Sequence, residues 1–146
     1  MAALVAGFGC SILSAEMVGQ KLPSGTLNFL GPKPEMEGQP LLLEFWATWC
    51  PPCRESIPHL NEIHGRFKDR GLLVVGVTDE PNAVIRKFQK EVPMDYAVAT
   101  DTGGRLNEKM GVNGIPHAFL VNKSGEIVWE GHPNRLRDED IEKILE

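Results

Sequence analysis

Two cysteines enclose two prolines in the segment Cys50-Pro51-Pro52-Cys53. The apolar run before them is typical of a buried strand, and the residues after them recur at helical spacing. Cys50 therefore lies at the N-terminus of a helix, where free N–H groups and the helix dipole stabilise a thiolate over a thiol. The residue types and their spacing predict a nucleophilic thiolate at Cys50.

Cys53 completes the chemistry that this spacing allows. Its own N–H can point back at the Cys50 sulfur in the N-cap to N3 pattern, while its side chain is more enclosed by the helix. We expect Cys50 to attack a partner disulfide and Cys53 to resolve the mixed disulfide. A structural zinc site would need four ligands. The chain has only three cysteines, and its four histidines are scattered singly.

The two intervening prolines bear on the direction of electron flow. Neither Pro51 nor Pro52 has an N–H to offer the Cys50 sulfur, which leaves the Cys53 N–H as its nearest backbone donor. A thiolate with fewer donors is stabilised less, and so is the reduced form of the pair. The sequence therefore predicts a pair at the reducing end of the range for such motifs.

The whole chain predicts a single α/β domain that positions this pair. It has 146 residues, of which 42% are hydrophobic, enough for one ordinary core. Its net charge of −5 offers no basic surface for nucleic acid. Strands are expected at Thr26–Leu30, Leu41–Ala47, Leu72–Thr78, Met94–Ala99, Ala118–Asn122 and Glu126–Glu130, and helices at Pro51–Arg70, from Pro81 to about Val92, at Arg105–Met110 and at Asp138–Leu145.

The N-terminal residues form an apolar leader. Residues 1–15 contain no charged side chain and resemble the apolar part of an export signal. We expect a leader over residues 1–19 and the domain over residues 20–146, with the leader cleaved or serving as a membrane anchor. Cys10 follows Gly9, as a lipid-attached cysteine would, but Gly7 stands where such signals usually have Leu. Lipidation of Cys10 and an incidental cysteine both remain open.

Three stretches carry a family resemblance. The segment LLLEFWATWCPPCRESIP resembles the active-site region of thioredoxin-fold proteins, and its core is similar to the TlpA/ResA-like redoxins of the AhpC/TSA type that serve cytochrome maturation. The segments GVTDE and GVNGIPHAFLVNKSGEIVWEGH extend the resemblance. It implies a thioredoxin fold with a mixed central sheet, a parallel core, an antiparallel edge hairpin and helices on both faces.

The resemblance also implies a function. It predicts a monomeric thiol:disulfide oxidoreductase that needs no cofactor and exchanges dithiols and disulfides with partner proteins. An upstream electron donor would reduce it again. Its expected location is extracytoplasmic, in a bacterial periplasm or anchored to the membrane facing it.

Further site residues follow from the matching positions. The resemblance implies a cis peptide bond between Ile115 and Pro116, in a loop that faces the cysteines. The exposed backbone of Ile115 would then pair with an extended substrate segment. Trp49, with Pro51 and Pro52, would supply apolar contact to partners, whereas Trp46 is expected in the core.

Glu44 is a candidate base. It interrupts an apolar strand, where a carboxyl is costly unless its pKa rises or it is paired. Thioredoxins have a buried acid beneath the resolving cysteine at this position, although TlpA and ResA-like proteins often have Asn. The alternative is a strand-end Glu that reaches water. Ser56 stands where many ResA-like proteins place a catalytic Glu, and Glu55 is expected to be a solvated helix residue.

Two other functions use the same cysteines. A peroxiredoxin would share the redoxin-type domain, but its nucleophile should follow a P-x-x-x-T-x-x-C pattern, and Ala47 stands three residues before Cys50. A copper- or zinc-binding chaperone would use Cys50, Cys53 and His117.

Overall fold

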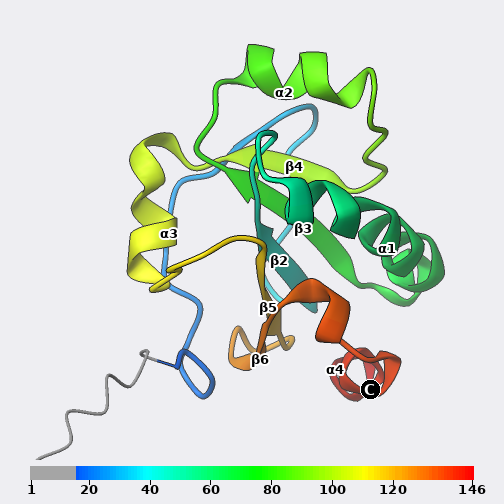
Figure 1. The fold of residues 1–146 in the computed structure, drawn as a ribbon. Helices are drawn as coiled ribbons and strands as arrows, with labels where there is room; N and C mark the ends of the chain where they lie inside the picture. The colour runs from blue at the N-terminus through cyan, green and yellow to red at the C-terminus, as the bar shows by residue number, and fades with distance from the viewer. Residues whose placement is uncertain (1–15) are drawn as a thin grey trace, which may run out of the picture.

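The computed structural model describes residues 16–146, which build one six-stranded sheet with helices packed against it (Figure 1). The predictions for Cys10 and for most of the leader lie outside the described residues. The strands are β1 (Asn28–Phe29), β2 (Leu41–Phe45), β3 (Leu73–Thr78), β4 (Ala97–Thr100), β5 (His117–Val121) and β6 (Ile127–Gly131). The helices are α1 (Pro51–Phe67), α2 (Asn82–Gln89), α3 (Arg105–Lys109) and α4 (Asp138–Leu145).

The sheet is mixed, as predicted, with strand order β1-β4-β3-β2-β5-β6. Strands β2, β3 and β4 pair in parallel, because α1 and α2 carry the chain back across the sheet between them. Strand β5 pairs antiparallel with β2, and the β5–β6 hairpin forms one edge. All five residues of β2 are buried, so the strand that leads into the cysteine pair is central.

Helices cover both faces of the sheet, as predicted. Alternate residues of β2 point to opposite faces, so Leu42 packs with α1 and α4 while Leu41 and Leu43 pack on the other side. Side chains of α3, Leu106 among them, join the second cluster. In Figure 1 the sheet separates α3 from α1 and α4, and α2 lies above the β4 end.

Most boundaries agree with the sequence within one to three residues, and the differences have local causes. The first strand keeps only Asn28 and Phe29 of the expected five residues, because only these two pair with β4. Helix α1 continues through Pro58 and ends in a 3-10 turn at Lys68–Arg70. Gly71 then takes a left-handed conformation with φ 97°, which favours glycine.

The last residues of the expected leader lie against the domain. Met17 is buried, and its N–H donates to the Glu130 carboxylate at 2.5 Å. The Gly19 N–H donates to the Ile127 carbonyl at 2.8 Å. Within residues 16–146, no helix is both long and apolar enough to span a membrane. The boundary after residue 19 stays a prediction.

Candidate active site

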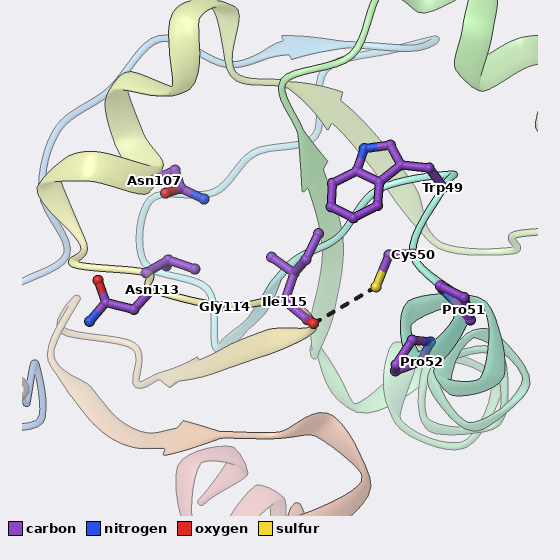
Figure 2. Close-up of a pocket in the computed structure, with 9 residues that line it drawn as sticks. Trp49, Cys50, Pro51, Pro52, Asn107, Asn113, Gly114 and Ile115 are labelled. Carbon is purple, nitrogen blue, oxygen red and sulfur yellow. Dashed lines mark hydrogen bonds between the residues drawn. The ribbon is translucent and has the colours of Figure 1, made fainter.

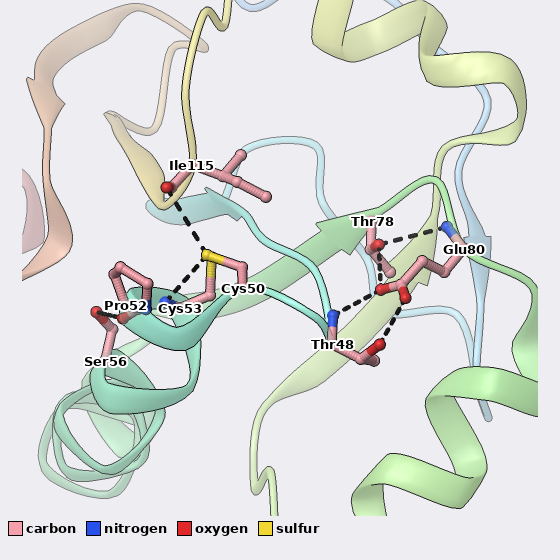
Figure 3. Close-up of a disulfide and its surroundings, with 8 residues drawn as sticks. All are labelled: Thr48, Cys50, Pro52, Cys53, Ser56, Thr78, Glu80 and Ile115. Carbon is pink, nitrogen blue, oxygen red and sulfur yellow. Dashed lines mark hydrogen bonds between the residues drawn. A yellow bond between two sulfur atoms is a disulfide. The ribbon is translucent and has the colours of Figure 1, made fainter.

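The cysteine pair lies where the central strand gives way to α1. Cys50 is the N-cap of this helix, with an extended backbone (φ −93°, ψ 107°), and Pro51 and Pro52 are its first two helical residues. The backbone N–H of Cys53 donates to Cys50 Sγ at 3.2 Å, which is the N-cap to N3 geometry that the spacing predicts. The two sulfurs form a disulfide (Figure 3).

The two cysteines differ in access to the surface. Cys53 is fully buried, and Cys50 is 3% exposed at the edge of a pocket of about 490 Å³. Figure 2 shows Cys50 between the pocket and α1. The pocket is lined by Trp49, Cys50, Pro51, Pro52, Asn107, Val112, Asn113, Gly114 and Ile115. A partner that enters this pocket therefore meets the Cys50 side of the disulfide.

The loop before β5 faces the disulfide. Its Ile115–Pro116 peptide bond is cis, as the resemblance implies. The Ile115 carbonyl oxygen lies 3.8 Å from Cys50 Sγ (Figure 2). Main-chain groups of Ile115 thus stand beside the sulfur that lines the pocket.

The two tryptophans near the site have opposite environments. Trp49 is 72% exposed and lines the pocket beside Cys50. Trp46 is buried and packs against Phe88 with ring centroids 5.5 Å apart. The expectation of a core Trp46 is confirmed, and Trp49 lies exposed at the pocket.

Glu44 is buried, and neither of its carboxylate oxygens has a hydrogen-bond partner among residues 16–146. Burial raises the pKa of the Glu44 carboxyl well above its ordinary value. By strand alternation, its side chain points to the face that α1 covers, between Leu42 and Trp46. These neighbours pack with Ile57 and Cys53 of α1 respectively. The alternative of a strand-end Glu that reaches water is therefore excluded.

Other polar groups gather around Glu44. Gly76 is its register partner on β3, and a Cβ there would meet Trp46 Nε1 at 3.0 Å and the Tyr96 ring at 3.2 Å. The absent side chain thus lets both rings approach. The Tyr96 hydroxyl and the Trp46 indole N–H are also buried without hydrogen-bond partners in the described residues. Burial, and secondarily the charge of Glu44, raises the pKa of Tyr96.

Helix α1 departs from the ResA-like pattern as its sequence indicates. Ser56 is buried, and its hydroxyl donates to the Pro52 carbonyl at 3.1 Å. Glu55 is exposed, as expected. In this chain Ser56 thus bonds to its own helix and places no carboxylate beside the cysteines.

His117, a candidate metal ligand, contacts Glu130 and Phe119. Its Nε2 lies 3.2 Å from the Glu130 carboxylate, and its ring stacks edge-on against Phe119 at 4.8 Å between centroids. Within residues 16–146, no three His, Cys, Asp or Glu side chains gather in a way that could hold a metal ion.

Several site residues were missed at the sequence level. Asn107 of α3 and Asn113 line the pocket, and only their nearness to the Gly114-Ile115-Pro116 loop in sequence or fold could have suggested them. Glu80 is another, because in the sequence it is only an acid before Pro81, where a helix is expected to begin. Its carboxylate accepts hydrogen bonds from Thr48, in the link between β2 and Cys50 (Figure 3). Helix α2 begins two residues later, with Pro81 as N-cap and no side-chain cap.

Comparison with known proteins identifies the family. The model of the AhpC/TSA family matches residues 19–130. The chain belongs to this family, in its TlpA/ResA-like branch. It is 31% identical over 133 residues to the thiol-disulfide oxidoreductase ResA of Bacillus thuringiensis subsp. konkukian, which covers 88% of this chain and 76% of that protein.

Solved structures agree with this assignment. A protein from Chlorobium tepidum assigned as thiol:disulfide interchange protein DsbE has a TM-score of 0.73 at 31% identity, over 86% of this chain and 91% of that one. The thioredoxin domain of a Bacteroides vulgatus thiol-disulfide oxidoreductase has a TM-score of 0.74 at 26% identity, over 88% and 98%. This AhpC/TSA member therefore has the predicted thioredoxin fold and is a thiol-disulfide oxidoreductase.

Proposed function

We propose that this AhpC/TSA-family protein is a reductase of protein disulfides. The observation that carries the proposal is that, within residues 16–146, one backbone N–H donates to the nucleophilic sulfur. Cys53 N–H donates to Cys50 Sγ at 3.2 Å, and the two residues between them are prolines without an N–H. A thiolate that receives few hydrogen bonds stabilises the reduced state little, so the dithiol gives its electrons away readily.

The reaction begins at the sulfur that faces the pocket. In the reduced protein, the Cys50 thiolate attacks one sulfur of the partner disulfide, forms a mixed disulfide and releases the other partner sulfur as a thiolate. Cys53 then loses its proton and attacks Cys50 Sγ. The Cys50–Cys53 disulfide forms and the second partner thiolate leaves, so two electrons pass from the protein to the partner. The burial of Cys53 and the pocket position of Cys50 support this division of roles.

Glu44 serves as the acceptor of the Cys53 proton in this proposal. It lies on the face that α1 covers, and neighbouring Trp46 packs in the same cluster as Cys53. A carboxylate whose pKa is raised by burial is a stronger base than an exposed one, which suits it to take a thiol proton near neutral pH. Among residues 16–146, no hydrogen-bond donor contacts its oxygens, so nothing there stabilises the carboxylate and lowers its basicity.

The substrate lies across Trp49 and the cis-proline loop in this proposal. The backbone of Ile115 pairs with an extended segment that carries the target cysteine, and cis Pro116 holds that backbone toward Cys50. Trp49, Pro51 and Pro52 are exposed and provide apolar contact. No cofactor takes part.

The cellular setting remains part of the proposal. We place the protein outside the cytoplasm, as a periplasmic or membrane-anchored monomer held through its leader, with partner proteins in cytochrome maturation and an upstream dithiol donor. The uncharged residues 1–15 and the similarity to ResA and DsbE support this placement.

A reduction assay and an oxidation assay together test the direction of electron transfer. The reduced protein should reduce insulin disulfides, while the oxidised protein should form disulfides in reduced, unfolded ribonuclease only slowly. Oxidation of ribonuclease that is faster than the reduction of insulin would contradict the reductase assignment. Consumption of hydrogen peroxide as fast as the reduction of insulin would favour the peroxiredoxin alternative.

A further inference from the structure

The partly buried carboxylate of Glu80 binds the segment that precedes Cys50. Glu80 follows β3, and its Oε1 accepts from the Thr48 N–H at 2.8 Å and from the Thr78 hydroxyl at 2.9 Å. Its Oε2 accepts from the Thr48 hydroxyl at 2.6 Å. Figure 3 shows both oxygens facing the link that leads to Cys50.

This contact fixes the middle of the link between β2 and α1. The Trp46 N–H still pairs with the Val77 carbonyl at 3.0 Å, where the sheet ends. Thr48 is then bound to Glu80 through both its backbone and its side chain. The Cys50 N–H bonds to the Ala47 carbonyl at 3.3 Å, which closes a short turn. Glu80 therefore ties this turn to the end of β3, beyond the last backbone hydrogen bond at Trp46.

The use of a charged group here has a physical reason. Hydrogen bonds to an ionised carboxylate are stronger than those between neutral groups, and a carboxylate only accepts. Thr48 offers it two donors and Thr78 a third. No side-chain hydrogen bond caps the N-terminus of α2, so Glu80 does not act as a cap for that helix.

We propose that Glu80 is a positioning residue for thiol-disulfide exchange. By binding Thr48, it sets where Trp49 and Cys50 stand relative to Ile115, whose carbonyl lies 3.8 Å from Cys50 Sγ. Attack on a disulfide needs the sulfurs in line, so a small displacement of Cys50 slows exchange. The inference rests on the exchange activity of the Cys50–Cys53 pair and is independent of the direction of electron flow.

Paired variants separate the contact from the charge. Glu80→Ala removes all three hydrogen bonds, Glu80→Gln keeps the shape and one acceptor oxygen, and Thr48→Val removes only the hydroxyl donor. Asp79→Ala is the control, because Asp79 is the exposed neighbouring acid and makes none of these bonds. All variants carry Cys10→Ser, so that the reacting thiols are Cys50 and Cys53.

Two probes measure reactivity in each reduced variant. Insulin and a small aromatic disulfide report in-line exchange, and the plateau rate of iodoacetamide alkylation at high pH reports mere access to Cys50. We expect Glu80→Ala to slow exchange with both disulfides by about tenfold or more, while the alkylation plateau changes by less than about twofold. Thr48→Val should show a smaller loss, and Glu80→Gln should recover most of the rate lost in Glu80→Ala.

Other outcomes would overturn the inference. An unchanged exchange rate in folded Glu80→Ala would do so, as would an equal loss in Asp79→Ala. A loss matched by faster alkylation would show that the site has simply opened, which assigns Glu80 a purely structural role. If Glu80→Ala does not fold, Thr48→Val decides, and an exchange rate equal to that of the parent contradicts the proposal. Each readout compares the rate of a variant with that of the parent. These ratios do not depend on the direction of electron flow, so a failure of the reductase assignment would leave them unaffected.

Discussion

The backbone N–H of Cys53 donates to Cys50 Sγ at 3.2 Å across two prolines that have no N–H of their own. An N-cap group normally accepts from the N–H of the second or third helical residue, and in α1 these are Pro52 and Cys53. One of the two usual donors is thus missing, which leaves the thiolate form of Cys50 less stabilised.

Restoring that donor should make the pair more oxidising. Pro52→Ala places an N–H at the second helical position, and a hydrogen bond to a charged group contributes about 1.5–3 kcal/mol. We expect a larger thiolate fraction of Cys50 at a given pH and a reduction potential raised by about 30 mV or more. Pro51→Ala, at the first helical position, is the matched control and should have a smaller effect. Equal shifts in both variants would contradict this account of the N-cap.

Glu44 should make stability depend on pH. Its pKa is raised in the folded state, so its protonated form contributes stability that is fully present below the unfolded pKa of about 4.3. That stability is lost as the pH rises through the folded pKa. Urea unfolding of the oxidised protein should therefore show that Glu44→Gln gains stability relative to the parent as the pH rises. Glu55→Gln, at an exposed site, should show no such trend, and parallel curves for Glu44→Gln and the parent would contradict the burial of an ionisable group.

Glu44→Gln should also slow turnover near neutral pH, because the amide cannot accept the Cys53 proton. The rate of insulin reduction as a function of pH tests this. We expect the variant to approach the parent only at alkaline pH, where Cys53 ionises without help. If the two pH profiles coincide throughout, Glu44 has no part in the mechanism.

Single-cysteine variants should separate nucleophile from resolving thiol. In a Cys10→Ser chain, reduced Cys53→Ser should accumulate a mixed disulfide between Cys50 and insulin, since the resolving attack is missing. Cys50→Ser should trap little, because Cys53 is fully buried. Non-reducing electrophoresis measures both, and equal trapping would show that the roles are assigned wrongly.

The two tryptophans offer a test of substrate contact. Trp49 is 72% exposed, so Trp49→Ala should change the free energy of unfolding by no more than about 0.5 kcal/mol. It should raise KM for insulin more than it changes exchange with a small disulfide. Trp46→Ala, at a buried site, should instead cost about 3–5 kcal/mol of stability. A Trp49 variant with parental KM would remove this side chain from substrate binding.

The sequence predicts most of the scaffold because its strongest signals are local. The apolar run into Cys50, the helical spacing after it and the two closely spaced strands at Ala118–Asn122 and Glu126–Glu130 each specify an element or a hairpin, and the structure contains all three. The cis bond at Pro116 was predicted from the resemblance, since no local pattern distinguishes it from an ordinary proline.

Contacts between distant segments could not be predicted from the sequence. Thr48 and Glu80 are 32 residues apart and meet only because β2 and β3 end side by side. An acid before a proline predicts a helix start, and α2 does begin there, but this local pattern carries no signal for the contact between Glu80 and Thr48. The gathering of Tyr96 and Trp46 around Glu44 likewise depends on Gly76, whose missing side chain matters only once the strands are paired.

The reduction potential of the Cys50–Cys53 pair tests the central claim most directly. It can be measured by equilibration of the Cys10→Ser protein with a redox buffer of known potential. A pair with one backbone donor to its thiolate should lie near the value of thioredoxin, about −270 mV. A potential at or above that of protein disulfide isomerase, about −180 mV, would contradict the proposal that this protein reduces the disulfides of its partners.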